Sequence, residues 1–440
     1  MKSALPKVLQ PLAGRPLLAH AIDTARSLEP AAVHVVYGHG GERVREALAA
    51  EPVDWTLQAQ QLGTGHAVLQ AIPKVPDEHV ALILYGDVPL LSRQTLQQLV
   101  ALAGPRQVAL LTMTPEDPAG YGRVVRDRQG HVARIVEQKD ASAEERGIRE
   151  SNTGVLAAPA KLLKRWLEGL KADNSQREYY LTDIIAMAVR EGVAVNPLGC
   201  ADAIEALGVN DKVQLAMLES VCRQRAALEL MLAGVTVADP ARIDVRGRVS
   251  HGKDVFIDVN VVLEGQVRLG DRVRIGPGCV IRDAEIGDDT QVFPHCVIES
   301  ATIGPKCNIG PFARFRPTST LSSGVHIGNF VEVKNSTMAE ESKANHLSYV
   351  GDAQVGARVN IGAGTIIANY DGANKHRTVI ENDVHTGSNS VLVAPITVGA
   401  GATVAAGSTV ANQVPAGKLT IARARQTTIE GWTRPTKQKK

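Results

Sequence analysis

The stretch IGPKCNIGPFARFRPTSTLSSGVHIGNFVEVK, residues 303–334, places an apolar side chain at every sixth position. The repeated positions are Ile303, Ile309, Phe315, Leu321, Ile327 and Val333, and a second unbroken series follows at Ile380, Thr386, Leu392, Val398, Val404 and Val410. A repeat of this length predicts a solenoid, because each hexapeptide can form one short strand whose inward side chain stacks on its counterpart in the next coil. We therefore expect residues 234–425 to form a parallel β-helix of hexapeptide repeats.

Two segments interrupt the six-residue count, at residues 338–352 and 373–383. A solenoid accepts insertions as loops on one surface, and such loops often carry function. We interpret both segments as inserted loops, with His346 in the first. Cys279 and Cys296 are expected in adjacent coils on one face, where two stacked thiols without further ligands fill the core rather than bind a metal.

The first 200 residues have a different pattern, in which apolar runs alternate with helical spacing. Strands are expected near residues 31–38, 79–87, 107–113 and 151–158, and helices near 45–51, 63–72, 92–103 and 160–171. Such alternation predicts an α/β domain with a mostly parallel sheet covered on both faces, and ligands collect at the carboxyl ends of such strands. We assign this domain to residues 1–210, a linker helix to 211–233 and a basic C-terminal tail to 426–440.

Composition limits the classes of partner. The 48 Lys and Arg residues against 46 Asp and Glu leave a formal charge of +2, which gives no electrostatic reason to expect nucleic acid or a membrane surface. No stretch approaches the roughly 18 apolar residues of a membrane span, and the N-terminus lacks the apolar core of a signal peptide. Five cysteines without a CxxC pair fit reduced thiols. We expect a cytoplasmic protein.

Several residues could carry chemistry, but each has an ordinary structural reading. Asp87 follows an apolar run and could hold Mg²⁺ on a phosphate at a strand's carboxyl end, or it could open a turn before Pro89. Thr64 opens a helix whose amides could receive a phosphate or a base edge, or it could be a simple N-cap. Arg316 and Lys334 read as solvated surface cations. A lone histidine such as His346 is more often structural than catalytic.

Motifs of the first half occur in the order found in sugar-1-phosphate nucleotidyltransferases. These are LPKVLQPLAGRPLLAH (5–20), QLGTGHA (61–67), LYGDVPL (84–90), GYGRVV (120–125), IVEQKDA (135–141), NTGVL (152–156) and GVNDKVQL (208–215). In the second half, RFRP (314–317), VEVK (331–334), NHLSYVGD (345–352), NIGAGTIIANYDGANK (360–375) and AAGSTV (405–410) resemble bacterial enzymes that join an N-acetylglucosamine-1-phosphate uridyltransferase to a glucosamine-1-phosphate acetyltransferase. The resemblance covers essentially the whole chain and implies a Rossmann-like domain followed by a left-handed β-helix.

For the first domain, the resemblance implies uridylyl transfer from UTP to N-acetylglucosamine 1-phosphate, with Mg²⁺ as cofactor. It assigns Lys7 to the phosphates and Asp87 with Asn210 to the metal. The uracil contacts would be Gln58, Gly63 and Thr64, joined by Tyr85 and Gly86, and the amino-sugar contacts would be Gly122, Glu137 and Asn152.

For the second domain, the resemblance implies transfer of the acetyl group of acetyl-CoA to glucosamine 1-phosphate. It makes His346 the general base and assigns the sugar phosphate to Arg316 and Lys334. The remaining sugar contacts would be Tyr349 and Asn360, and the acetyl-CoA contacts would be Ala363, Asn369, Tyr370, Ser388, Ala406 and Arg423. Asn345 stands where the family has Gly before its histidine. The family also implies a homotrimer with the acyl site between subunits.

The resemblance also implies a buried strand and a Gly-rich loop, L-x-x-G-x-G-T-R-M, of which Met1 looks like the last residue. We expect either a start codon further upstream or a truncation that impairs uridylyl transfer. Two other hypotheses stay open: an acetyltransferase alone, and a non-catalytic solenoid scaffold. A base beside phosphate-binding cations argues against the scaffold.

Overall fold

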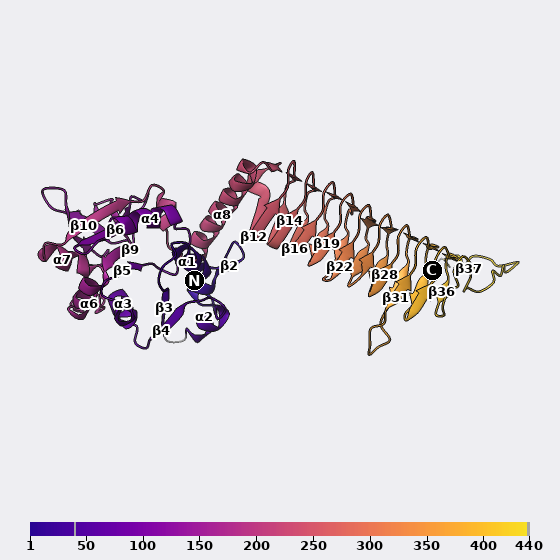
Figure 1. Ribbon diagram of the computed structural model, residues 1–440, viewed down its shortest axis with the longest axis horizontal. Helices are drawn as coiled ribbons and strands as arrows, with labels where there is room; N and C mark the ends of the chain where they lie inside the picture. The colour runs from indigo at the N-terminus through magenta and orange to yellow at the C-terminus, as the bar shows by residue number, and fades with distance from the viewer. Residues whose placement is uncertain (39–40, 438–440) are drawn as a thin grey trace. The chain divides into compact units, whose positions relative to one another are not determined.

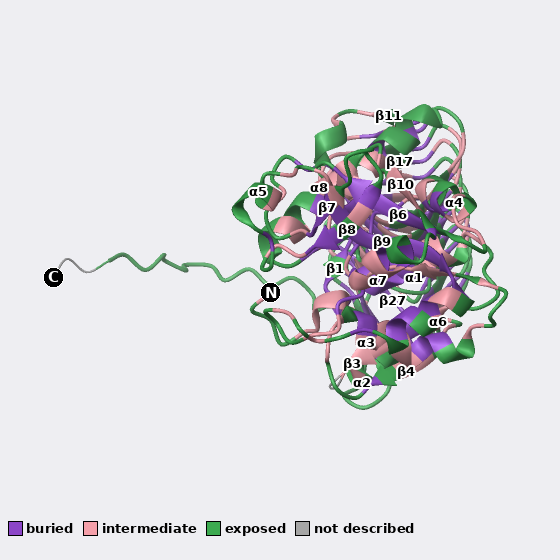
Figure 2. Ribbon diagram, turned by 90° about the vertical axis from the view of Figure 1, so that its left-hand side faces the viewer, coloured by how far each residue is buried: buried purple, intermediate pink, exposed green. Residues whose placement is uncertain are grey.

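The computed structural model describes residues 1–38 and 41–437. It divides into two compact units, Met1–Glu219 and Ser220–Lys440, and the boundary falls within helix α8, Lys212–Leu232. No helix in the described part of the chain is long and apolar enough to cross a membrane. The tail predicted from residue 426 is exposed up to residue 437, as Figure 2 shows, and its last three residues lie outside the described ones.

The first unit contains short helices around a mixed sheet. The helices besides α8 are α1 Leu17–Arg26, α2 Glu42–Ala47, α3 Thr64–Ala71, α4 Arg93–Ala101, α5 Ala143–Arg146, α6 Ala160–Glu168 and α7 Asp183–Arg190. The strands are β1 Pro11–Leu12, β2 Arg15–Pro16, β3 His34–Gly38, β4 Asp54–Gln58, β5 Val80–Ile83, β6 Gln107–Met113, β7 Arg123–Arg126, β8 Val132–Val136, β9 Ser151–Pro159 and β10 Ala194–Gly199.

The main sheet has the order β10-β6-β9-β7-β8, with β5 also paired to β9. Strands β5, β6 and β10 run in one direction, as the alternation predicts, and β9 runs antiparallel between β5 and β6. All nine residues of β9 are buried, and Figure 2 shows β6 and β9 within the core. β3 and β4 form a separate parallel pair. Among the described residues, the second edge of β5 has no strand partner.

The second unit is the predicted parallel β-helix, whose coils stack along one direction in Figure 1. One face is an 11-stranded sheet of β11 Thr236–Val237, β13 Phe256–Ile257, β15 Arg274–Ile275, β17 Gln291–Val292, β20 Asn308–Ile309, β23 His326–Asn329, β26 Lys343–His346, β29 Asn360–Ile361, β32 His385–Thr386, β35 Thr403–Val404 and β37 Leu419–Thr420.

The other two faces are joined by the long strands β12 Ile243–His251, β14 Val261–Leu269 and β16 Val280–Ile286. One continues as β18 Val297–Glu299, β21 Arg314–Phe315, β24 Glu332–Lys334, β27 Tyr349–Gly351, β30 Ile366–Ala368, β33 Val391–Val393 and β36 Thr409–Val410. The other continues as β19 Ala301–Ile303, β22 Ser319–Leu321, β25 Thr337–Met338, β28 Ala353–Val355, β31 Thr378–Ile380 and β34 Ile396–Val398.

Every position of the two six-residue series is buried, so the predicted solenoid core is confirmed. Phe315 is among the largest fully buried side chains of the protein. Cys279 and Cys296 are fully buried. They lie in adjacent coils, since their neighbours Val280 and Val297 are paired in register. Each inward side chain removed from water contributes about 1.5–3 kcal/mol to the stability of the fold, so the long stack stabilises the β-helix coil by coil.

The prediction that residues 338–352 form an inserted loop was wrong. This segment continues the ladder through β25 to β27, with Met338, Ala344 and Val350 buried in the core. The count slips because one turn is a residue shorter, and a shortened repeat interrupts the period just as an insertion does. His346 is therefore the last residue of strand β26. The second interruption does contain a loop, between β30 and β31.

Candidate active sites

Three residues that are far apart in sequence meet beyond the carboxyl end of β5. The ammonium of Lys7 contacts Asp87 Oδ2 and donates to Asn210 Oδ1 at 3.1 Å. Val209 holds the backbone of Asp87 in place, because Val209 N donates to the Asp87 carbonyl oxygen at 2.9 Å. The predicted phosphate and metal residues are thus brought together.

The donor set at this point fits Mg²⁺. One carboxylate oxygen and one amide oxygen converge on a single cationic group, the Lys7 ammonium, so a cation position between them exists. Mg²⁺ sites in nucleotide enzymes use one or two carboxylates, with water and substrate phosphates completing the shell. No group of three or more His, Cys, Asp or Glu side chains forms a closed metal cage in the described residues.

The three predicted amino-sugar residues also come together. Gly122 O accepts from Asn152 N at 2.8 Å, and a Cβ on Gly122 would lie 3.4 Å from Glu137 Oε2. Thr182, which the sequence did not single out, donates its hydroxyl to Glu137 Oε1 at 2.9 Å. Burial raises the pKa of Glu137, and Asp183 and Asp140 add to this shift.

Tyr85 lies between these two groups. Burial raises its pKa to about 12, with Thr64 hydrogen-bonded to it and the charges of Glu137 and Asp87 close enough to act on it. The ring packs on Gly154, where an added Cβ would be 2.5 Å from a ring carbon. Gly86 has similarly little room, since its Cβ would meet Leu18 at 3.0 Å.

The turn before α3 does not use Thr64 as its cap. Thr64 is not the N-cap; Gly63 occupies that position with φ 106°, and Thr64 is the first helical residue. Its hydroxyl accepts from Leu181 N at 3.2 Å, so it links α3 to the segment before α7 instead of capping its own helix. Gln58 is buried and donates its amide to Gly63 O at 3.1 Å and toward His66 Nδ1 at 3.0 Å.

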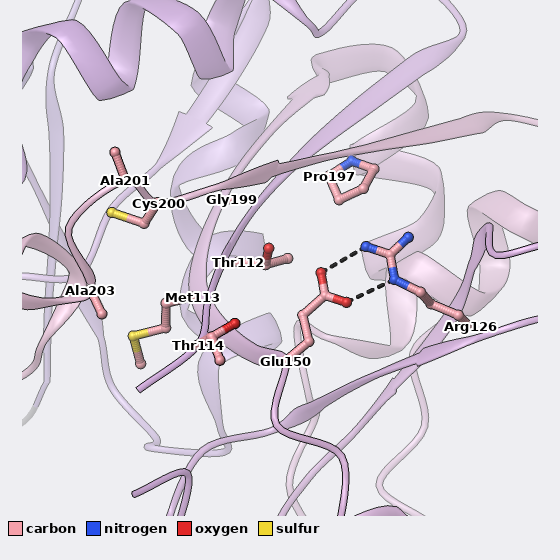
Figure 3. Close-up of a pocket in the computed structure, with 10 residues that line it drawn as sticks. All are labelled: Thr112, Met113, Thr114, Arg126, Glu150, Pro197, Gly199, Cys200, Ala201 and Ala203. Carbon is pink, nitrogen blue, oxygen red and sulfur yellow. Dashed lines mark hydrogen bonds and ion pairs between the residues drawn. The ribbon is translucent and has the colours of Figure 1, made fainter. Parts of the chain in front are cut away.

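A cavity of about 560 Å³ in the same unit contains none of the predicted residues. It lies at the ends of β6 and β10 (Figure 3), lined by Thr112, Met113, Thr114, Arg126, Glu150, Pro197, Gly199, Cys200, Ala201 and Ala203. Its two charged side chains neutralise each other, because Arg126 Nε and Nη2 donate to Glu150 at 2.7 and 2.8 Å. We assign no chemistry to it.

In the β-helix, His346 begins a column of predicted acetyl-CoA residues, one in each coil. His346 O accepts from Gly364 N, Ala363 O from Asn389 N, and Ser388 O from Gly407 N. Arg423 closes the column by donating to Ala406 O at 2.6 Å. Coils separated by about 4.8 Å make the distance from His346 to Arg423, over four steps, about 19 Å. An extended cofactor can lie along this edge.

The imidazole of His346 is oriented by a residue that the sequence analysis missed. Its Nδ1 lies 3.1 Å from Asn329 Oδ1, and these two residues are paired in register between β23 and β26. An amide oxygen only accepts hydrogen bonds, so this contact places the proton on Nδ1. Nε2 is left with the lone pair that a general base requires.

The predicted sugar-phosphate residues occupy an adjacent face. Arg316 and Lys334 are in neighbouring coils, since Phe315 and Val333 are paired. Arg316 donates to Glu332 at 3.2 Å, and Lys334 lies 3.7 Å from Asp352. Gly351 leaves room for the ring of Tyr349, because its Cβ would be 2.3 Å from the Tyr349 hydroxyl.

The loop between β30 and β31 brings further groups to this face. Asn369 Nδ2 contacts Asp352 Oδ2 and lies 3.4 Å from the Tyr349 hydroxyl. Lys375, which the sequence analysis did not assign, has its pKa lowered by the neighbouring Lys334 ammonium. Tyr370 is exposed and donates to Gly372 O.

Asn360 is the one predicted sugar residue that stays apart from this group. It lies in β29 on the 11-stranded sheet, whereas Lys334 and Tyr349 belong to the other sheet. Within the described residues, no hydrogen bond or ion pair links it to Lys334 or Tyr349.

The Gly154 contact yields a prediction. Gly154→Ala should lower the free energy of unfolding of the first unit more than Gly130→Ala, a matched control with almost the same φ (84° and 86°) but no atom near its Cβ. The left-handed backbone costs both variants roughly 1–2 kcal/mol. The clash with Tyr85 should add about 1–3 kcal/mol to Gly154→Ala alone. Urea unfolding measures both, and equal losses would contradict the Tyr85 packing.

Family models match both parts of this chain. Residues 1–181 match the MobA-like NTP transferase domain, residues 245–328 the GMPPB C-terminal domain, and residues 377–412 the bacterial transferase hexapeptide repeat. A solved nucleotidyl transferase from Methanothermobacter thermautotroptrophicus is 18% identical with a TM-score of 0.35, covering 49% of this chain and 84% of that one.

Full-length relatives are much closer in sequence. The bifunctional protein GlmU of Aromatoleum aromaticum is 58% identical over the whole of this chain and 96% of its own, and that of Azoarcus sp. is 58% identical over the whole chain and 97% of its own. GlmU of Stutzerimonas stutzeri is 56% identical, again over the whole chain and 97% of the relative. The chain belongs to the family of bifunctional GlmU proteins.

Proposed function

We propose that this bifunctional transferase makes UDP-N-acetylglucosamine in two steps. The β-helix unit transfers the acetyl group of acetyl-CoA to glucosamine 1-phosphate. The first unit then transfers the uridylyl group of UTP to N-acetylglucosamine 1-phosphate and releases pyrophosphate. The observation that carries the proposal is His346, whose free Nε2 stands at the head of the column of predicted acetyl-CoA residues.

Acetyl transfer uses this chain's own groups. Lys334, with Arg316 and Lys375, anchors the sugar phosphate, so that the amino group is held at the thioester carbonyl. The amine nitrogen forms a bond to the carbonyl carbon, the carbon–sulfur bond breaks, and coenzyme A leaves as its thiolate. His346 Nε2 takes the proton that the nitrogen loses and then gives it to the thiolate, which yields the free thiol and restores the base.

Uridylyl transfer needs positioning more than acid–base chemistry. The oxygen of the sugar 1-phosphate attacks the α-phosphorus of UTP, and the bond to pyrophosphate breaks. Asp87 and Asn210 would hold Mg²⁺, which neutralises phosphate charge when bound. Lys7 binds a phosphate oxygen, Gln58 with Gly63 and Thr64 contacts the uracil, and the group around Glu137 holds the amino sugar.

Assembly and location follow from the same assignment. Within one chain, Asn360 lies on a different sheet from Lys334, so the two stay apart there. A homotrimer would bring Asn360 of one copy to the Lys334 face of the next. Sedimentation equilibrium tests the number of chains. We assign the protein to the cytoplasm because its five cysteines form no CxxC pair and fit a reducing compartment, and cell fractionation tests this.

A further strand on the open edge of β5, followed by a Gly-rich loop, would complete the nucleotide site. The support is that, among the described residues, this edge of β5 pairs with no strand and β3–β4 form a separate sheet. Extending the chain by such a segment should raise uridylyl transfer, since one preorganised donor is worth roughly 10²–10³-fold. Equal rates for the two chains would remove this part of the proposal.

For the acetyl transfer, His346→Ala should lower kcat on the order of 10²–10⁴-fold, with little change in KM for glucosamine 1-phosphate, because only proton removal is lost. Release of the coenzyme A thiol measures the rate. His326→Ala is the control, since His326 lies on the same sheet and also pairs with an asparagine, Asn308, at 3.3 Å. Full kcat in His346→Ala would remove the base; a wild-type chain that releases no thiol would favour a scaffold.

For the uridylyl transfer, Asp87→Asn should reduce pyrophosphate release about 100-fold or more, because the site loses its one metal-binding carboxylate. Acetyl transfer by the same protein should be unchanged, since the two units have separate cores. Asp77→Asn provides a control that breaks an exposed ion pair with Lys164. Parallel loss of both activities would point to misfolding instead of a metal site.

A further inference from the structure

One corner of the β-helix carries a row of linked polar side chains. Thr318, Asn335 and Asp352 occupy equivalent turns of successive coils, each with a left-handed backbone (φ 64°, 45° and 50°). The Thr318 hydroxyl donates to Asn335 Oδ1 at 2.8 Å. The amide of Asn335 must then present its NH₂ to the next coil, where it donates to Asp352 Oδ1 at 2.5 Å. The row therefore fixes one oxygen of Asp352.

The second oxygen of Asp352 faces the acetyl-transfer site. It accepts from Asn369 Nδ2 and lies 3.7 Å from Lys334 Nζ. The same Asn369 nitrogen is 3.4 Å from the Tyr349 hydroxyl. Asp352 is only 9% exposed, and a carboxylate that is so buried is stable only when paired and hydrogen-bonded. Both of its oxygens meet that condition.

The ammonium groups of Lys334 and Lys375 need a negatively charged partner, and Asp352 supplies it. Lys334 and Lys375 lie close enough for Lys334 to lower the pKa of Lys375, and the charge of Asp352 acts in the opposite direction. Burial alone would raise the pKa of Asp352, but its hydrogen bond from Asn335, the Lys334 charge and the Asn369 hydrogen bond lower it overall. The two ammonium groups thus share one fixed counter-charge before any phosphate binds.

We propose that Asp352 is the positioning residue of the acetyl-transfer site: it holds Lys334 and Lys375 together as a clamp for the phosphate of a phosphorylated amino sugar. Through Asn369 it also ties this clamp to Tyr349. The inference rests on the proposed acetyl transfer and goes beyond it, since Asp352 itself needs no contact with the substrate. Without the carboxylate, the two ammonium groups repel each other and the clamp opens.

The test is steady-state acetyl transfer by the full chain carrying Asp352→Asn. KM for glucosamine 1-phosphate should rise about 10–100-fold, with kcat changed much less, because a charged hydrogen-bonded partner of the clamp is lost. The pH at which KM begins to rise on the alkaline side should also move lower, since Lys375 loses the carboxylate that favours its charged form. A merely structural role would not produce that pH shift.

Three comparisons make the result decisive. Asp383→Asn removes a carboxylate that pairs with Arg358 at 2.7 Å on another corner, and it should leave KM unchanged. Asn335→Ala keeps the Asp352 carboxylate but removes the hydrogen bond that fixes one of its oxygens, so KM should rise less and without the pH shift. This variant tests the proposal even if Asp352→Asn does not fold. In a Lys375→Met background, the effect of Asp352→Asn should shrink.

The outcomes separate the two proposals. If the wild-type chain releases no thiol with glucosamine 1-phosphate and acetyl-CoA, the acetyl transfer itself is wrong. If the wild-type chain is active while folded Asp352→Asn keeps its KM and pH profile, the positioning role is overturned. An Asp352→Asn effect that is undiminished without Lys375 would also overturn it.

Discussion

The fixed spacing between parallel coils is the constraint on which the β-helix site depends. Each coil can only place a side chain at positions set by the ladder of its neighbours, about 4.8 Å away. Residues 17 or 18 apart in sequence therefore stack in columns, as the hydrogen bonds from His346 to Asn329 and from Asn308 to His326 illustrate. The buried aliphatic series maintains the register, and the outward columns hold the residues that we propose for acetyl transfer.

The same register explains why the acetyl-transfer groups occupy two faces. His346 ends a strand of one sheet. Three residues later, Tyr349 begins a strand of the other sheet. The corner between them separates the proposed base and acetyl-CoA column from the proposed phosphate clamp. His346, Lys334 and Tyr349 lie in strands of the ladder, and Lys375 is added from the loop between β30 and β31. Fixed strands suit a reaction that depends on close approach of nitrogen and carbonyl carbon. The nucleotide site instead gathers its residues beyond strand ends, where Asp87 and Asn210 come from distant segments.

The sequence predicted the solenoid because its period is local: Ile309, Phe315 and Val404 could be assigned to the core from spacing alone. It misplaced His346, because a shortened repeat and an insertion break the period in the same way. Lys7, Asp87 and Asn210 were found through motif resemblance, since nothing local marks contacts 80 and 203 residues apart. Thr182, Lys375 and Asp352 were missed for a related reason. Each is an ordinary polar residue until the fold supplies its partner.

A crystal structure of the chain with coenzyme A bound tests the proposed acetyl-transfer edge most directly. The cofactor should lie along the column from His346 through Ala363, Ser388 and Ala406, with its thiol end near His346 and its far end near Arg423. A cofactor bound on another face, or one running along the column with its thiol far from His346, would contradict the assignment of this edge to acetyl transfer.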